Sequence, residues 1–352
     1  MVRHVKRRRF IAASGIAGIA TLAGCIGEDA VEDENGDDPD DDDMDDMDDD
    51  GNGEDADDDE LEAEPDDDGE VLTLDAGGTE GTYYPLAGDM KTIVEDHTPH
   101  GVTVRSTGAS VENVATLGRE DVELALVQND IAYFAYTGTE LEEFEGEPID
   151  NLRGIASLYP ETIHIVTQED SDIETVADLE GASINTGDLG SGTQVNALQI
   201  LESAGIEDFD EQNTDFGTAA DQIGDGDVDA AITVGGYPLG AIEDLSATQD
   251  ISFVEVTEDV REQLLDDAEW LAEDTIPGGT YDGVDDDVET VSVQAMLATH
   301  EAADEEIVEE VTAALFDNVD DFTTQADFID LETAQEGMPI DLHPGADAYF
   351  DG

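Results

Sequence analysis

The sequence predicts an α/β fold with largely parallel sheets, preceded by a leader and an acidic segment. From residue 70 onwards, short runs rich in Val, Ile and Leu alternate with amphipathic stretches of helical period. The turns between them are rich in Gly, Ser and Thr. Strand, helix, strand at this spacing is typical of α/β layers. The stretch 70–352 is long enough for one large domain or two lobes.

The predicted elements follow one another in regular order along this stretch. Three strand and helix pairs come first, at 71–76 and 83–96, at 102–105 and 110–117, and at 123–127 and 130–136. After a stretch at 149–158, strands are predicted at 163–167, 183–186 and 230–234, with helices at 193–204 and from Leu239 onwards. No internal repeat of short fixed period is present.

The N-terminal segment, 1–24, predicts export and a lipid anchor. A twin-arginine pair at Arg7 and Arg8 precedes a mostly apolar run at 11–23, which ends in the lipobox Leu-Ala-Gly-Cys at Cys25. Cleavage before Cys25 and lipidation of its thiol would leave the chain outside the cytoplasm, anchored to the outer face of the cell membrane as a lipoprotein. A retained membrane helix is the alternative, but the run is shorter than the ~20 residues that a bilayer core needs.

Charge restricts the medium and the partners. The chain has 10 Lys and Arg against 95 Asp and Glu, and five of the basic residues lie in the segment 1–24, which has no acid. Self-repulsion on this scale opposes compaction at ordinary ionic strength, whereas at about 1 M salt the Debye length is only about 3 Å. The composition is typical of a halophilic protein. Nucleic acid is excluded as an expected partner, because phosphate contacts need clustered Lys and Arg.

Residues 25–69 predict a disordered acidic tether behind the lipidated Cys25. They contain Asp and Glu with Gly, Asn and Ala and almost nothing to bury. Flexible-coil scaling gives a reach of ~35 to 40 Å. The run 46–51 begins like a calcium loop, but position twelve is Asp57 instead of Glu and no apolar helices flank it. Cys25 is the only cysteine, so no disulfide or cysteine-based zinc site is expected.

The candidate chemistry lies in three strand-to-helix turns, at 77–82, 107–110 and 187–193. In an α/β sheet, ligands bind outside the carboxyl ends of strands, where helix N-termini attract anions. Three such turns can converge on one small acid. Each turn can also serve only to start a helix, and Ser191 with Gln194 fits a capping box.

Motifs for catalysis and cofactors are not found. The Gly-rich turns lack the order G-x-G-x-x-G, a P-loop Lys and the G-x-S-x-G spacing. The histidines after residue 25 are isolated, so neither a metal nor a catalytic residue is expected. Arg105 and Arg153 can pair with a ligand, but structural salt bridges are favoured in so acidic a chain.

Six short motifs occur in order between residues 78 and 238: GTEGTYYP at 78–85, STGASVEN at 106–113, LVQND at 126–130, IASLYPE at 155–161, GSGT at 190–193 with Asn196, and GGYP at 235–238. In these motifs the stretch from 71 to about 320 resembles the TAXI-type solute receptors of TRAP transporters. The resemblance implies a type II periplasmic-binding-protein fold, in which two α/β lobes close over one ligand. Lobe one would be 70–165 plus 292–352, and lobe two 166–291.

The resemblance and the turns predict the same ligand-binding site. Lobe one would contribute Thr79, Gly81, Thr82, Tyr83, Ser110, Asn113, Gln128, Asn129 and Tyr133. Lobe two would contribute Ser191, Gly192, Thr193, Asn196 and Tyr237. Backbone N–H groups and hydroxyls suit a carboxylate, and the amides suit its further oxygens or an amine.

The resemblance implies a receptor and not an enzyme. Such a receptor would capture a small carboxylate, a glutamate-like amino acid or a C4 to C5 dicarboxylate, by lobe closure. It would then deliver the ligand to TRAP membrane permease subunits. The alternatives are a receptor for an ABC transporter, a sensor, or an extracellular enzyme on the same scaffold.

Overall fold

The computed structural model of the chain describes residues 60–66 and 69–352. The predicted export signal, Cys25 and the tether up to residue 59 lie outside the described residues. Within the described ranges, no helix combines the length and the apolar character that crossing a membrane requires.

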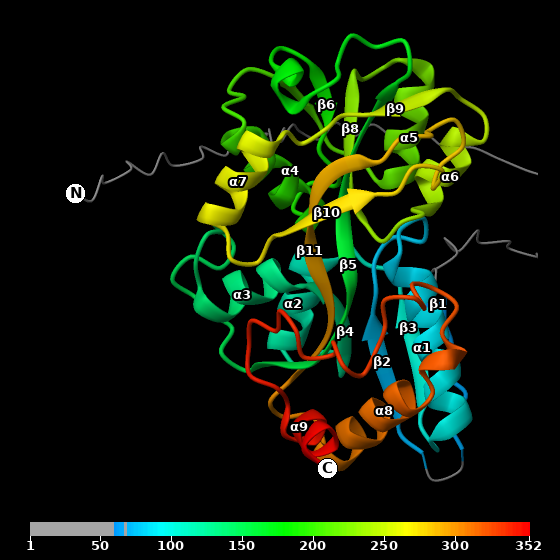
Figure 1. The fold of residues 1–352 in the computed structure, drawn as a ribbon. Coiled ribbons are helices and arrows are strands. Elements are labelled where there is room, and N and C mark those ends of the chain that lie inside the picture. The colour runs from blue at the N-terminus through cyan, green and yellow to red at the C-terminus, as the bar shows by residue number, and fades with distance from the viewer. Residues whose placement is uncertain (1–59, 67–68) are drawn as a thin grey trace, which may run out of the picture. The chain divides into compact units, whose positions relative to one another are not determined.

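One mixed sheet forms the centre of the described fold, with helices around it (Figure 1). The strand order is β1-β3-β2-β4-β11-β5-β8-β6-β7, with β10 paired to β11 and β9 to β5. The strands are β1 (Glu60–Leu61), β2 (Val71–Asp75), β3 (Gly101–Arg105), β4 (Leu124–Gln128), β5 (Leu152–Gln168), β6 (Ser183–Asn185), β7 (Asp210–Gln212), β8 (Ala230–Gly235), β9 (Ile251–Phe253), β10 (Ala272–Ile276) and β11 (Val288–His300). The helices are α1 (Tyr83–His97), α2 (Ser110–Gly118), α3 (Asn129–Thr137), α4 (Gly192–Ser203), α5 (Phe216–Asp225), α6 (Gly240–Ser246), α7 (Glu258–Asp267), α8 (Glu305–Asp317) and α9 (Pro344–Asp351), with short 3-10 turns η1 (Val176–Leu179) and η2 (Val319–Asp321).

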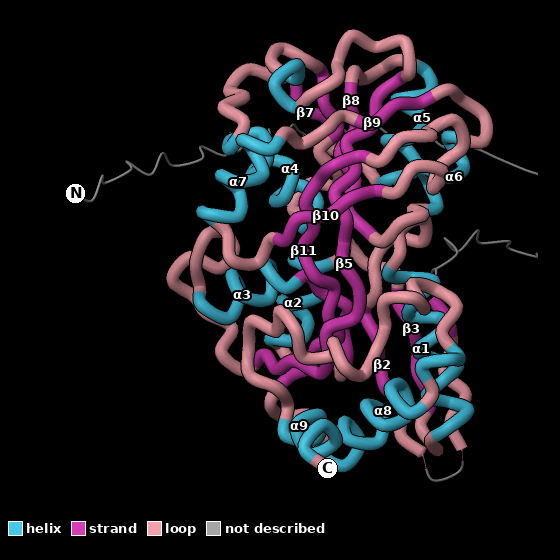
Figure 2. Tube along the Cα trace, in the orientation of Figure 1, coloured by secondary structure: helices cyan, strands magenta, loops and turns pink. Residues whose placement is uncertain are grey.

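Two long antiparallel strands, β5 and β11, divide this sheet into two halves (Figures 1 and 2). The first half comprises the described residues before β5 and residues 301–352, and in it β2, β3 and β4 are parallel. The second half comprises residues 169–287, in which β6, β7 and β8 are parallel. Because β5 and β11 run through both halves, the chain passes between them twice. This architecture is the predicted type II class, and the α/β prediction is confirmed.

Each half has its own apolar core on both sides of the sheet. In the first half, Leu86 on α1 and Leu126 on β4 are fully buried. In the second half, Ile184 on β6, Ile200 on α4 and Ile232 on β8 are fully buried together. The strands are covered by helices on both faces, which explains why they are almost continuously apolar instead of alternating.

Two predicted boundaries differ from the structure. The stretches predicted separately at 149–158 and 163–167 are one strand, β5. Pro160 interrupts the apolar pattern, but it lies beside a register shift between β5 and β11, where a strand tolerates proline. The tether prediction extended too far, because residues 60 and 61 pair with β3 at the edge of the sheet.

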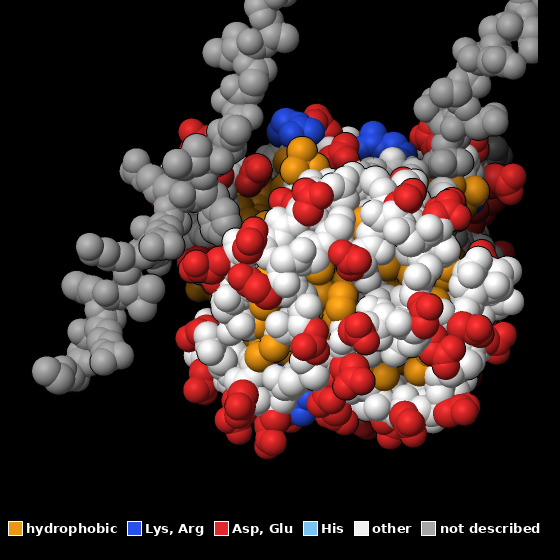
Figure 3. Space-filling view, turned by 90° about the horizontal axis from the view of Figure 1, so that it is seen from above, with side chains coloured by type: hydrophobic (Ala, Val, Ile, Leu, Met, Phe, Trp, Pro, Cys, Tyr) orange, Lys and Arg blue, Asp and Glu red, His pale blue; other side chains and the backbone are white. Residues whose placement is uncertain are grey.

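The surface is acidic, with few cations. Figure 3 shows Asp and Glu side chains scattered over the visible face and few Lys or Arg. All five Lys and Arg of the described ranges lie within 4 Å of a carboxylate: Lys91, Arg105, Arg119, Arg153 and Arg261. The structural salt bridges expected for Arg105 and Arg153 are therefore confirmed, with Asp75 at 2.6 Å and Glu301 at 2.5 Å.

Candidate functional site

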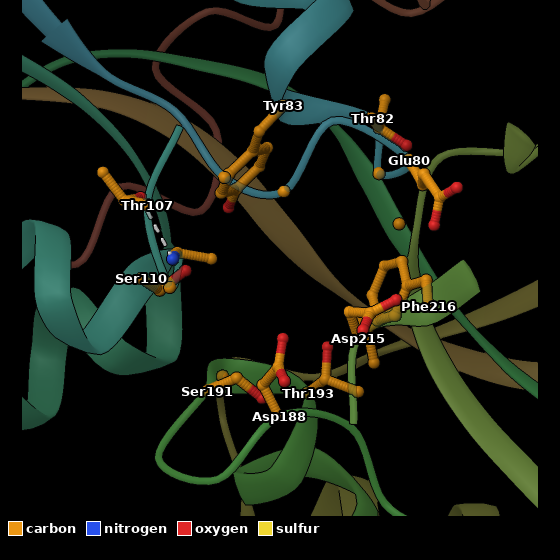
Figure 4. Close-up of a pocket in the computed structure, with 18 of the residues that line it drawn as sticks. Glu80, Thr82, Tyr83, Thr107, Ser110, Asp188, Ser191, Thr193, Asp215 and Phe216 are labelled. Atoms are coloured by element: carbon orange, nitrogen blue, oxygen red, sulfur yellow. Dashed lines mark hydrogen bonds between the residues drawn. The ribbon is translucent and has the colours of Figure 1, made fainter. Parts of the chain in front are cut away.

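A cavity of about 220 Å³ lies where turns from both halves meet (Figure 4). The turn after β2 and the turn after β3 line it from the first half, with Gln128 at the end of β4. The turn after β6, the start of α5 and the end of β8 line it from the second half. In Figure 4, Ser191 and Thr193 lie opposite Tyr83 and Ser110. The three predicted turns therefore do converge on one cavity.

Four helices, α1, α2, α4 and α5, begin at this cavity. Ser191 Oγ accepts a hydrogen bond from Gln194 N at 3.1 Å, and Asp215 Oδ1 accepts one from Thr218 N at 2.9 Å. The N-cap residues of α1 and α2, Thr82 and Ala109, make no side-chain cap. Uncapped first-turn N–H groups and the helix dipole both favour an anionic ligand group.

The start of α2 is held in a strained conformation. Ala109 has φ 65° and ψ −148°, a backbone region that residues with a Cβ rarely adopt. Such strain costs of order 1–3 kcal/mol and persists only where the surroundings enforce it. Here Thr107 Oγ1 accepts from Ala109 N at 3.1 Å, and Ser110 Oγ accepts from Gln128 N at 3.0 Å. The strained turn thus places the first residues of α2 against the cavity.

A buried carboxyl group, Glu161 on β5, forms the floor of the cavity. It is 3 % exposed, and it accepts hydrogen bonds from Tyr83 Oη and from Gln128 Nε2, the latter at 3.4 Å. The pKa of Glu161 is raised to about 8, mainly by burial and also by the nearby Asp130, although the two hydrogen bonds oppose the shift. Burial and the neighbouring Glu161 also raise the pKa of Tyr83. At neutral pH the floor of the cavity is therefore mostly uncharged.

A chain of hydrogen bonds connects this floor to the second half. Gln128 Nε2 donates to Asn196 Oδ1 at 3.2 Å, and Asn196 Nδ2 donates to Asp130 Oδ2 at 2.7 Å. Asp130 is fully buried, and this burial raises its pKa to about 6 against the hydrogen bond from Asn196. The Asn196 amide is the member contributed by the second half.

The structure brings together most, but not all, of the predicted ligand-binding residues. Those that line the cavity are Thr79, Gly81, Thr82, Tyr83, Ser110, Gln128, Ser191, Gly192 and Thr193. The others, Asn113, Asn129, Tyr133, Asn196 and Tyr237, do not line it.

Each residue outside the cavity makes other contacts. Asn113 Nδ2 donates to the carbonyls of Ala76 and Leu126 and so joins strands β2 and β4 to α2. Asn129 Nδ2 donates to the Trp270 carbonyl, and the Tyr133 ring stacks on Trp270 at 5.8 Å.

Tyr237 and Asn196 also have partners other than the cavity. The Tyr237 ring packs edge-on against Phe328, and its carbonyl accepts from Gln325 Nε2 at 3.3 Å. Asn196 is 1 % exposed and lies behind Gln128.

Acidic residues at the cavity were missed by the sequence analysis. The lining includes Glu80, Glu161, Asp188 and Asp215, together with Tyr159 and Phe216, and no Lys or Arg is among the lining residues. Burial and the neighbouring Asp215 raise the pKa of Asp188. The available signal was Glu161, a lone acid inside an apolar strand, but single acids do not stand out in a chain with 95 of them.

The histidines and acids do not assemble into a metal centre in the described part of the chain, where no three His, Cys, Asp or Glu side chains are placed to hold an ion. His164 is fully buried, and burial lowers its pKa to about 4. Its ring nitrogens lie 2.9 Å from the Thr162 carbonyl and 2.9 Å from Tyr281 Oη, so it has a structural role.

Comparison with known proteins gives one family and several similar folds. The model of the NMT1-like family matches residues 74–351. A chloride-bound protein from Xanthomonas citri has 10% identity and a TM-score of 0.45, with 80% of this chain and 95% of that chain covered. A TctC solute binding protein from Polaromonas has 14% identity and a TM-score of 0.44, with 77% and 89% covered. The periplasmic aliphatic sulphonate binding protein SsuA from Escherichia coli has 14% identity and a TM-score of 0.43, with 80% and 78% covered.

Proposed function

Because this chain belongs to the NMT1-like family, and because four helix N-termini from two α/β halves meet at one cavity, we propose that it is an extracytoplasmic solute-binding protein of a transporter. It captures a small organic anion between the two halves and delivers it to a TRAP-type membrane permease. The convergence of the helix N-termini is the observation that carries this proposal, since uncapped N–H groups of α1 and α2 suit a carboxylate.

The charges around the cavity favour a glutamate-like amino acid over a C4 to C5 dicarboxylate. Glu80, Asp188 and Asp215 line the cavity and no lining residue is basic, so a dianion would meet like charges without a compensating cation. An amino acid brings its own ammonium group, which can pair with these carboxylates while its carboxylate occupies the helix N-termini. The hydroxyl of Thr193, which also lines the cavity, supplies a further hydrogen bond.

Capture follows from the position of the cavity between the halves. Ligand contacts made to both halves exist only when these are close together, so binding shifts the population towards the closed arrangement. The lipidated Cys25 would hold the receptor at the outer face of the membrane, within reach of the permease. The acidic surface suits a halophilic, salt-screened medium. A fused multi-helix permease encoded beside this gene would favour a TRAP system over an ABC transporter.

Enzyme chemistry is not supported by the hydroxyl groups at the cavity. Ser110 Oγ accepts from Gln128 N and Ser191 Oγ accepts from Gln194 N, and within the described residues neither hydroxyl is hydrogen-bonded to a histidine or a carboxylate. A nucleophilic serine needs an adjacent base to accept its proton. The receptor proposal accordingly predicts that the bound ligand is released unchanged.

A thermal-shift screen at multimolar salt tests the proposal. L-Glutamate and 2-oxoglutarate form a matched pair that differs at the amine, and succinate, a sugar and inorganic phosphate complete the set. A ligand at 100 times its Kd adds about 2.7 kcal/mol of stability, which raises the melting temperature measurably. A shift with L-glutamate that exceeds the shift with 2-oxoglutarate supports the proposed cargo. Equal or larger shifts with the dicarboxylates contradict the charge argument, and no shift with any acid contradicts the proposed site.

A further inference from the structure

Four glycines of the second half lie where side chains of the first half reach across. A methyl group placed on Gly192 would overlap with Gln128 Oε1, and one placed on Gly217 would overlap with Glu80 Oε2. The same holds for Gly236 and the amide of Gln325, while a Cβ on Gly235 would lie 2.9 Å from Thr82 Oγ1. We call these four positions the glycine seats.

Backbone conformation does not account for these glycines. None of the four has φ in the left-handed region, so any residue could adopt their backbone conformations. Gly192 and Gly217 lie in the first turns of α4 and α5, where alanine is the better helix former. Glycine leaves space for a side chain from the other half most clearly at Gly192, where Gln128 is buried. At Gly217 the opposing Glu80 side chain is exposed, and at Gly235 an added Cβ would also lie 2.9 Å from Leu239 of the same half.

The seat at Gly192 is connected to the cavity floor. Gln128 is 3 % exposed and donates to both Glu161 and Asn196, so its side chain cannot turn away without losing these hydrogen bonds. Its Oε1 atom is buried and has no donor. Asn196, one turn along α4 from Gly192, is fixed in turn by Asp130 of the first half. This seat therefore ties the position of α4 to the residues that line the cavity.

We propose that the glycine seats form the interface on which the two halves close, and that the seat of Gln128 on Gly192, with Asn196 as its positioning residue, couples closure to the cavity. This inference deepens the proposed function, because it assigns the residues that make the closed arrangement. It changes the role of Asn196 from a ligand contact to a residue that acts through Gln128. A side chain at Gly192 holds the halves apart, whether or not a ligand is present.

Disulfide trapping measures closure without any ligand. The ideal Cβ position at Gly235 lies 3.8 Å from Thr82 Cβ, which is the mean separation in disulfides. The parent for the test is the full chain with Thr82→Cys, Gly235→Cys and Cys25→Ser. Oxidation is followed on non-reducing gels and by mass. Because even a transient closed population is trapped, the rate reports how often the halves reach the described arrangement.

Gly192→Ala in this parent should slow trapping by about tenfold, the effect of losing ~1.4 kcal/mol of hydrogen bonding from Gln128. The matched control is Gly224→Ala in α5, where the nearest atom to an added methyl is 3.5 Å away. This control should trap at the parent rate. Adding Gln128→Ala removes the side chain that the new methyl meets, so Gly192→Ala should then have no further effect.

Three results would each contradict the proposal. Because a Cβ at Gly235 would also lie 2.9 Å from Leu239 Cδ1, the parent is made with and without Leu239→Ala. If neither version forms the disulfide under oxidising conditions, the proposal is overturned, since the halves then do not reach this arrangement. Equal rates for Gly192→Ala and Gly224→Ala overturn it as well. Slowing that persists in the Gln128→Ala background assigns the effect to α4 itself and not to the seat. None of these readings depends on the ligand screen, so a wrong cargo leaves the test intact.

Discussion

Glu161 should make the stability of this protein depend on pH in a way that one substitution removes. Its carboxyl group is buried on the cavity floor, and burial raises its pKa from the ordinary 4.5 to about 8. Between these two values the folded protein keeps a proton that the unfolded chain releases. The free energy of unfolding therefore falls as pH rises through this window, and it is unaffected by this group below about pH 4.

The magnitude follows from the size of the shift. At about 1.4 kcal/mol per pH unit, the full shift corresponds to roughly 4 to 5 kcal/mol. Glu161→Gln keeps the shape of the protonated side chain but cannot ionise. The difference in unfolding free energy between the variant and the natural protein should therefore grow in favour of the variant by several kcal/mol from about pH 5 to about pH 9. Asp130→Asn should reduce this pH dependence of the natural protein, because Asp130 is the second cause of the raised pKa.

Urea unfolding at constant high salt, followed by the fluorescence of Trp270, measures this difference. Trp270 is the only tryptophan and packs against Phe134 with ring centroids 4.8 Å apart. Glu142→Gln, an exposed change, serves as the control and should stay within about 0.5 kcal/mol of the natural protein. A free-energy difference for Glu161→Gln that stays constant over this pH range would refute the reasoning that burial keeps a proton on Glu161 in the folded protein.

Three further outcomes are expected. Arg105→Met leaves the fully buried Asp75 without its ion pair and should lower the free energy of unfolding, measured in urea, by about 2 kcal/mol. The loss is smaller than for a fully buried pair because the arginine side chain is 38% exposed, and the added change Asp75→Asn should recover part of it. The melting temperature should rise between about 0.1 M and about 2 M KCl, since salt screens the repulsion among 95 acids, and a flat profile would contradict this explanation. Ser191→Ala removes the hydrogen bond that caps Gln194 N and should lower the free energy of unfolding without ligand by about 1 kcal/mol. If Ser191 also contacts the ligand, the ligand-induced shift in melting temperature should fall too. An unchanged shift would assign Ser191 to capping alone.

The sequence predicts the first half of the fold better than the second. Its three strand and helix pairs match β2 to α3 closely, because each strand is buried on both faces and each turn begins a helix. The periodicity does not reveal that β5 continues through Pro160, since a register shift between strands is not visible in one strand alone. The antiparallel strand β11 depends on pairing between distant segments, for which a single sequence carries little signal. The helices after α6 were not predicted.

The convergence of the turns could be predicted, whereas the assignment of individual amides could not. Asn113, Asn129 and Asn196 stand in the right turns and have the right chemistry for a ligand. In the structure their amides are occupied by backbone carbonyls or by Gln128 and Asp130, because buried polar atoms must find partners wherever packing places them. Only three-dimensional packing decides which of two polar neighbours faces the cavity.

The acids at the cavity could not be recognised from the sequence for a different reason, which is the large number of acids in the chain. In a chain of ordinary composition, a single acid such as Glu161 within an apolar strand would be a clear candidate for a functional residue. In a chain with 95 acids it is not distinguished by the sequence. Burial distinguishes it: most acids are solvated on the surface, whereas Glu161 and Asp130 lie almost fully buried at the two ends of one hydrogen-bonded chain. Surface acids can be exchanged at little cost, but each of these two carboxyl groups constrains what its neighbours can do. The functional acids of such a chain are therefore identified by burial and partners, not by their number.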